Sequence, residues 1–203
     1  MQMRIQSTDW YVVQVMRGRE EAMVELIGRV VPGCLLSECF YPQFATETKV
    51  RGAWVPTTRP LFPGYLIAVT RDPVALEDAL VRMPEFARVL MMDDRPVPLA
   101  HEEVELIGGL TKPGERTVPM SRAVKVGDDV VITSSPLVGH EGLIREINRR
   151  KSVAYLEIDL CGRKVSTRVG IAVLSSPEAP EARAAVVCER ASERANEIAR
   201  ASA

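Results

Sequence analysis

The sequence has few of the residues that usually mark metal sites, acid–base catalysis and membrane spans. Its two histidines, His101 and His140, offer little chemistry near neutral pH. Four cysteines, at positions 34, 39, 161 and 188, lack the spacing of structural zinc sites, so we expect free thiols in a reducing compartment. No apolar run approaches the roughly 20 residues that a membrane-spanning helix needs. The sequence predicts a cytoplasmic protein with no metal site, no cofactor and no membrane contact.

Recognisable catalytic patterns are also missing. The sequence shows no Ser/His/Asp or Cys/His arrangement and no phosphate-binding G-x-x-x-x-G-K loop. Asp128 and Asp129 are paired carboxylates, but they open a strand after a glycine turn, which is a common structural setting. We therefore expect no catalytic residues and a protein that is not an enzyme.

Charge is balanced over the whole chain but not along it. The net charge of the 203 residues is −1, so no global basic field attracts nucleic acid. Residues 119–174, however, carry nine Lys and Arg against six Asp and Glu. This block is the basic part of the chain and indicates an anionic partner.

Apolar periodicity predicts an α+β fold for residues 9–111. The expected order is β-α-β-β-α-β-α, a small antiparallel sheet covered by helices. A turn is expected at Arg51-Gly52, which would make residues 46–58 a hairpin. The remaining expected strands are 10–15, 34–44, 66–70 and 86–92, and the expected helices are 21–31, 74–83 and 99–110.

Residues 112–122 lack periodicity and are predicted to be a linker. After them the sequence pattern changes to short β runs. Residues 123–174 contain five short β runs, at 130–133, 142–144, 153–158, 163–167 and 171–174. So small a sheet hides its edges best by closing, so we expect a small SH3-like β-barrel. Residues 175–203 are rich in Ala, Arg and Glu, and are expected to form a flexible or helical tail.

Three sequence motifs follow one another along the chain. The first is Trp10-Tyr11-Val12-Val13-Gln14 before a basic turn and a helix, and the second is Phe62-Pro63-Gly64-Tyr65 before a strand. The third combines Val126-Gly127-Asp128, the run from Pro136 to Gly142, and Cys161-Gly162-Arg163. Together they resemble the NusG family of transcription elongation factors. The first two match its N-terminal (NGN) domain, and the third matches its C-terminal KOW domain.

This resemblance implies that residues 9–111 bind the clamp helices of RNA polymerase. A rigid apolar patch with aromatic anchors suits the docking of a helix. The positions that match the family's contact region are Phe62, Pro63, Gly64 and Tyr65, with Tyr11 added from the first strand. The alternative is that Phe62 packs in the core and only Tyr65 reaches the surface.

Two basic groups are the candidates for nucleic-acid binding. Arg17 and Arg19 lie where specialised family members touch the non-template DNA strand, and a solvated turn is the alternative. The KOW region carries the other group, whose clustered cations suit the phosphates of an RNA hairpin. That group consists of Arg145, Arg149, Arg150, Lys151, Arg163, Lys164 and Arg168, and a solvated charged turn is again the alternative.

The region 49–60 and the basic hairpin at 145–151 resemble the specialised LoaP-like antiterminators, which are recruited to selected operons by leader RNA. The function implied is processive antitermination by a protein expected to be monomeric. Two alternatives stay open at this point. One is a general NusG-type elongation factor that couples to the ribosome or Rho, and the other is a ribosome-associated KOW protein.

Overall fold

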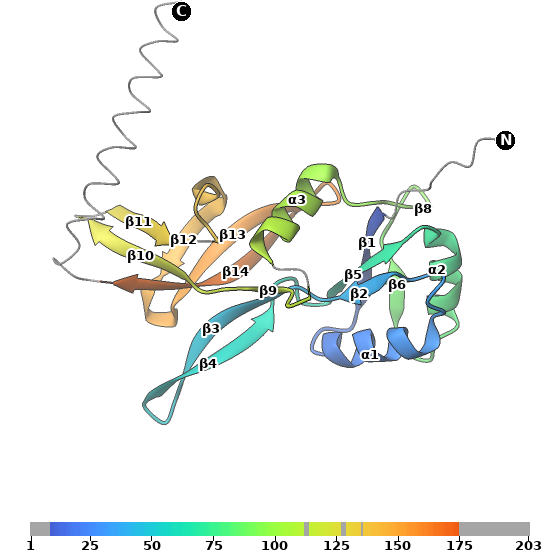
Figure 1. Cartoon of the computed structure of the whole chain (residues 1–203), viewed down its shortest axis with the longest axis horizontal. Coiled ribbons are helices and arrows are strands. Elements are labelled where there is room, and N and C mark those ends of the chain that lie inside the picture. The colour runs from blue at the N-terminus through green and yellow to red at the C-terminus, as the bar shows by residue number, and fades with distance from the viewer. Residues whose placement is uncertain (1–8, 112–113, 127–128, 135, 175–203) are drawn as a thin grey trace, which may run out of the picture.

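The computed structural model describes residues 9–111, 114–126, 129–134 and 136–174. Its first half is built on a four-stranded antiparallel sheet in the order β2-β5-β1-β6 (Figure 1). The central pair, β1 and β5, is rich in β-branched and aromatic residues, which favour strands. The four strands are β1 (Asp9–Val15), β2 (Glu38–Phe40), β5 (Tyr65–Thr70) and β6 (Ala87–Val89).

This sheet has a separate core on each face, because successive side chains of a strand point to opposite sides. Val13 and Leu66 pack with side chains of α1 (Glu20–Val30) and α2 (Pro73–Val81). Their neighbours Val12 and Ile67 belong to a different core on the other face. Helices α1 and α2 therefore cover one face of the sheet, and the residues of the second core cover the other face.

A long hairpin projects from the body of the molecule (Figure 1). It consists of β3 (Gln43–Val50) and β4 (Ala53–Pro60), paired from Gln43↔Pro60 to Val50↔Ala53. Arg51 and Gly52 form its turn with φ values of 48° and 90°, the left-handed region that two-residue hairpin turns favour. The predicted turn at Arg51-Gly52 is confirmed.

The strand predicted for residues 34–44 is wrong in its extent. Residues 32–35 form a turn in which Leu35 N donates to Pro32 O at 2.9 Å, and β2 contains only Glu38–Phe40. Pro42 then separates β2 from β3, since proline has no N–H to give to a ladder. The expected strand is therefore divided between two sheets, with β2 in one and the beginning of β3 in the other.

The first half ends with short elements. β7 (Met91–Met92) and β8 (Arg95–Pro96) are joined by Asp93 and Asp94, both with positive φ. Helix α3 (His101–Leu110) follows and buries Ile107 and Leu110.

Residues 121–174 form a second, β-rich domain, called the β domain below. Pairing joins its strands in the order β11-β10-β14-β13-β12, with short 3₁₀ turns η1 (Glu141–Leu143) and η2 (Arg149–Lys151). The predicted α+β fold class is confirmed. The strands are β10 (Ser121–Val126), β11 (Asp129–Ser134), β12 (Ile144–Asn148), β13 (Val153–Leu160) and β14 (Arg163–Leu174).

The count of five strands agrees with the sequence prediction, but their identity differs. The β run predicted at 142–144 is mostly wrong, because residues 142 and 143 lie in η1 and β12 begins at Ile144. Residues 171–174 are not a separate strand, because they continue β14 without a break. The strand that was missed is β10, which lies in parallel alongside the end of β14, from Ser121↔Ile171 to Val124↔Leu174. Gly127 and Asp128 of the third motif, and the predicted tail at 175–203, lie outside the described residues.

The two halves share one hydrophobic core on the second face of the first sheet. Val12, Phe40 and Phe62 of the first half pack in the same cluster as Leu156 and Ile171 of the β domain. Strand β14 passes so close to β3 that a Cβ on Gly170 would lie 2.0 Å from the carbonyl oxygen of Ala45. The hydroxyl of Thr167 also donates a hydrogen bond to the carbonyl of Leu61.

The segment predicted as a linker, 112–122, contains secondary structure where it is described. β9 (Thr117–Val118) runs in parallel to the base of β3, and β10 begins at Ser121. Just before β9, the Arg116 guanidinium stacks 4.1 Å from the Phe40 ring centroid and donates to Glu38 Oε1 at 2.8 Å. These contacts join residues more than 70 positions apart in the sequence, so the local sequence around Arg116 does not predict them.

Among the described residues no helix is long and apolar enough to span a lipid bilayer.

Candidate functional site

The Phe62–Tyr65 segment is a type II β-turn. Tyr65 N donates to Phe62 O at 3.1 Å, and Gly64, the third residue of the turn, has φ +88°. A type II turn requires positive φ at this position and favours proline at the second, which explains the order Pro63-Gly64. The turn delivers the chain into β5 with Tyr65 as its first residue.

Three groups from the β1–α1 region hold this turn. Glu20, only 3% exposed, accepts a hydrogen bond from Gly64 N at 2.7 Å through Oε1. Val15 N donates to Gly64 O at 2.9 Å. The Arg17 side chain lies alongside, since a Cβ on Gly64 would be 3.0 Å from Arg17 Cγ. Both the N–H and the C=O of Gly64 are therefore hydrogen-bonded, and these two bonds fix the turn.

The residues predicted to contact polymerase do not form one patch. Phe62 is 2% exposed and lies in the core shared with the β domain, so its ring is not presented to a partner. Pro63 and Tyr65 are half-buried, and Tyr65 packs on the edge of that core. Tyr11 is 7% exposed and points to the opposite face, beneath α1 and α2, where burial raises the pKa of its hydroxyl. Pro63 and Tyr65 are the only members of the predicted set whose side chains reach solvent.

Arg17 and Arg19 are exposed in the turn between β1 and α1. Arg19 N donates to Met16 O at 3.1 Å, which closes this turn. Because Arg17 also borders Gly64, this basic turn and the Phe62–Tyr65 turn are neighbours in space.

The basic residues of the β domain divide into two groups. Arg145 Nη2 and Lys164 Nζ both reach Glu157 Oε1, at 3.1 and 2.9 Å, and these contacts lower the pKa of Glu157. Arg163 is exposed at the start of β14. Within the described part of the chain, no ion pair engages Arg149, Arg150, Lys151 or Arg168. The second group therefore has no carboxylate partner in this part of the chain.

Turn η2 presents three of these cations in succession. Asn148 Oδ1 accepts from Lys151 N at 3.1 Å, and Ser152 ends the turn with φ 51°. Arg149, Arg150 and Lys151 are all exposed there.

A cleft of about 550 Å³ lies between the β3–β4 hairpin and the β domain, and we call it the interdomain cleft. Its charged lining is five cations and one carboxylate, with an exposed tryptophan. Lys49, Trp54 and Arg59 come from the hairpin, and the sequence analysis did not predict them as site residues. The lining residues are Phe44, Thr46, Glu47, Thr48, Lys49, Trp54, Arg59, Arg150, Lys151, Val153 and Arg168.

Part of this site was visible in the sequence. The hairpin turn at Arg51-Gly52 places Lys49 opposite Trp54, and that pairing is observed. What the sequence does not show is that β14 packs on β3, which brings the hairpin beside η2.

Comparison with known proteins agrees with this architecture. Residues 8–108 match the family model described as "Transcription termination factor nusG". The chain belongs to the NusG family. It is 28% identical over 172 residues to the transcription termination/antitermination protein NusG of Thermus thermophilus, covering 78% of this chain and 92% of that one. The NusG protein of Deinococcus radiodurans is 28% identical over 179 residues, with coverage of 78% and 93%.

A solved structure gives the same result for the fold. The structure titled "Domain interaction in Thermotoga maritima NusG" matches with a TM-score of 0.51 at 21% identity. The match covers 81% of this chain and 94% of the other. It therefore extends over both halves of the NusG-family architecture described above.

Proposed function

We propose that this NusG-family protein regulates transcription elongation by binding RNA polymerase beside the Phe62–Tyr65 turn. The supporting observation is the rigid presentation of Tyr65. A type II turn, anchored by Glu20 and Val15, holds a half-exposed aromatic side chain at the start of a central strand. Such a preorganised ring suits a docking surface for a helix, because little side-chain freedom is lost on binding. In this proposal Phe62 acts from the core, by supporting the turn.

We further propose that the protein promotes processive antitermination, and that a leader RNA hairpin recruits it through η2. Arg149, Arg150 and Lys151 are exposed, consecutive and without ion pairs among the described residues. Clustered cations of this kind fit the closely spaced phosphates of an RNA helix. Arg17 and Arg19, beside the Phe62–Tyr65 turn, are the candidates for contact with non-template DNA.

The test is termination read-through in a purified transcription system, on templates with an intact or scrambled leader hairpin. Read-through should need the intact hairpin and should fall when Arg149, Arg150 and Lys151 are all replaced by Ala. A matched control replaces three exposed cations of the first half, Arg29, Arg71 and Arg82. Equal loss in both triple variants would point to net charge alone and would contradict recruitment through η2.

Polymerase binding is tested separately with Tyr65→Ala. This variant should lose affinity for RNA polymerase, whereas Phe86→Ala, which removes a 46% exposed ring elsewhere in the first half, should not. If both variants bind polymerase like the parent protein, the Phe62–Tyr65 turn is not the docking surface.

The alternative is a general elongation factor, which is supported by the relatives named as NusG termination/antitermination proteins. Under this alternative, changes in pausing or read-through would be the same with the leader hairpin scrambled.

A further inference from the structure

We propose that the interdomain cleft binds a single-stranded nucleic acid, with one base stacked on Trp54 and the neighbouring phosphates held by Lys49, Arg150, Lys151 and Arg168. This inference rests on the proposed nucleic-acid role of the β domain and names a further ligand. The leader hairpin is a duplex that exposes its backbone, whereas this cleft suits an unpaired strand with accessible bases.

The charge of the cleft is the first argument. Its walls carry Lys49, Arg59, Arg150, Lys151 and Arg168 against a single carboxylate, that of Glu47. Arg59 Nη2 donates to a hydroxyl, Thr48 Oγ1, at 3.4 Å, rather than to a carboxylate. Five cations gathered around one carboxylate in a concave site repel one another, so an anion in the cleft relieves that repulsion.

Trp54 is the second argument. It is 48% exposed at the cleft wall, although tryptophan has a large apolar side chain that is usually well buried. Aromatic rings beside a basic groove are the usual platform for unstacked bases, and stacking tolerates any base sequence. An acidic peptide would use the cations but not the face of the ring, so the ring favours nucleic acid over peptide.

Thr46 adds a third observation. It lines the same cleft and is 5% exposed, and its Oγ1 has no hydrogen-bond partner among the described residues. Buried polar atoms normally find partners, so this hydroxyl can still make a hydrogen bond to a polar group that binds in the cleft.

The composition of the cleft also restricts when it can exist. Trp54 and Lys49 come from the hairpin of the first half, and Arg150, Lys151 and Arg168 come from the β domain. Neither half has both the stacking platform and the full set of cations. The single-stranded nucleic acid should therefore bind only while β14 is packed on β3.

The experiment is a titration of the full-length protein with oligonucleotides, followed by tryptophan fluorescence and by anisotropy of an end-labelled strand. The probes are a ten-nucleotide oligo(U) RNA, an oligo(dT) DNA of equal length, a blunt RNA duplex and a poly-glutamate peptide. We expect both single strands to bind, and the RNA and DNA arms show which of the two binds more tightly.

Trp54→Ala should raise the dissociation constant for the single strands by about 5- to 160-fold. Trp54→Phe should keep most of the affinity, since a smaller ring still stacks. Arg168→Gln should weaken binding and reduce the slope of log affinity against log salt by about 0.7.

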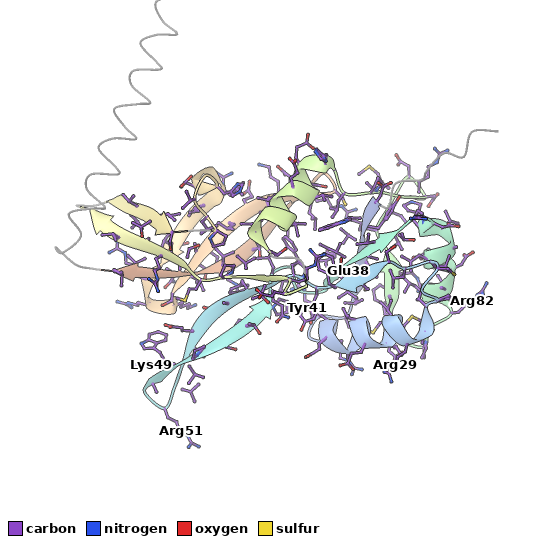
Figure 2. All side chains as sticks on the ribbon, viewed as in Figure 1. Arg29, Glu38, Tyr41, Lys49, Arg51 and Arg82 are labelled. Atoms are coloured by element: carbon purple, nitrogen blue, oxygen red, sulfur yellow. The ribbon has the colours of Figure 1, made fainter. Side chains whose placement is uncertain are left out.

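Matched controls come from cations outside the cleft. Figure 2 shows Arg51 at the tip of the hairpin and Arg82 far away at the end of α2, whereas Lys49 sits on the arm of the hairpin. Arg51→Gln and Arg82→Gln should change binding less than Lys49→Gln does.

Two outcomes would overturn the proposal. Single strands that bind Trp54→Ala as tightly as the parent protein would exclude stacking in the cleft. Trp54-dependent binding of poly-glutamate, without binding of either single strand, would assign the cleft to an acidic peptide. Neither result touches leader-dependent read-through, so failure of this inference and failure of the proposed function are distinguishable.

Discussion

Glu103 of α3 accepts a hydrogen bond from the backbone N–H of Cys161, the first residue of the tight turn between β13 and β14, at 2.7 Å. Its other oxygen, Oε2, accepts from Ala100 N at 2.7 Å, at the beginning of the helix. One carboxylate therefore stabilises the start of α3 and fixes the β domain to it. Its negative charge also adds to burial in raising the pKa of the Cys161 thiol to about 11.

Replacing Glu103 with Ala should destabilise the protein by about 1–3 kcal/mol, because two backbone donors lose a charged acceptor. The measurement is the free energy of unfolding in urea. Glu102→Ala is the control, since Glu102 is exposed in the same first turn and should change stability by no more than about 0.5 kcal/mol. Similar losses in both variants would mean that only the charge near the helix start matters.

Gly170 should not tolerate a side chain. A Cβ there would lie 2.0 Å from Ala45 O, and this neighbour is backbone, which cannot rotate away. We expect Gly170→Ala to cost about 1–3 kcal/mol, as overpacking usually does, and to loosen the contact between β14 and β3. Gly142→Ala is the control because open space surrounds that position. Equal thermal stability of the two variants would show that the strands are not packed as described.

The Glu20–Gly64 hydrogen bond should matter for stability and for polymerase binding together. Glu20→Ala leaves the buried N–H of Gly64 without an acceptor, at a cost of about 1–3 kcal/mol. Loss of this anchor should also weaken binding to polymerase at a temperature where the variant is still folded. Glu21→Ala changes the same charge on an exposed neighbour and should leave both measurements unaltered. Weakened polymerase binding in Glu21→Ala alone would contradict this role for Glu20.

Stability should fall at alkaline pH because of Cys39. Burial, together with the charge of Glu38, raises the pKa of its thiol to about 12 from an ordinary 9.0. The unfolded chain therefore loses this proton first, so the contribution is complete below pH 9 and declines as pH rises toward 12. At pH 10.5 the loss from this group is about 2 kcal/mol.

Urea unfolding of the parent protein and of Cys39→Ala at pH 8 and pH 10.5 measures this effect. Other groups also titrate in this range, so the informative quantity is the difference between the two proteins in their change with pH. Between pH 8 and pH 10.5, the free energy of unfolding of Cys39→Ala should fall by about 2 kcal/mol less than that of the parent protein. An identical decline in both proteins would show that Cys39 is accessible to hydroxide in the folded state.

Local patterns predicted much of this fold, and long-range packing accounts for what they did not predict. The β1–α1 order, the Arg51-Gly52 turn and the bend at Pro63-Gly64 depend on residues adjacent in sequence, and all three are present. The pairing of β2 with β5 and of β10 with β14 depends on partners far along the chain. No local signal reports such partners.

The candidate site divides in the same way. The exposed cations of η2 were evident from their sequence, since consecutive Arg and Lys are rarely buried. The burial of Phe62 was not, because it results from a core that the first half shares with the β domain. Lys49, Trp54 and Arg59 were missed because their neighbours in the cleft come from the other half.

The short strand β9 has a mechanical consequence. Only Pro119 and Met120 separate β9, which is paired with β3, from the start of β10. Two extended residues reach about 7 Å, so this tether allows the β domain almost no excursion while β9 stays paired. The two halves can therefore separate only after β9 unpairs from β3. The rate of that unpairing, rather than diffusion on a flexible linker, would set how fast the molecule opens.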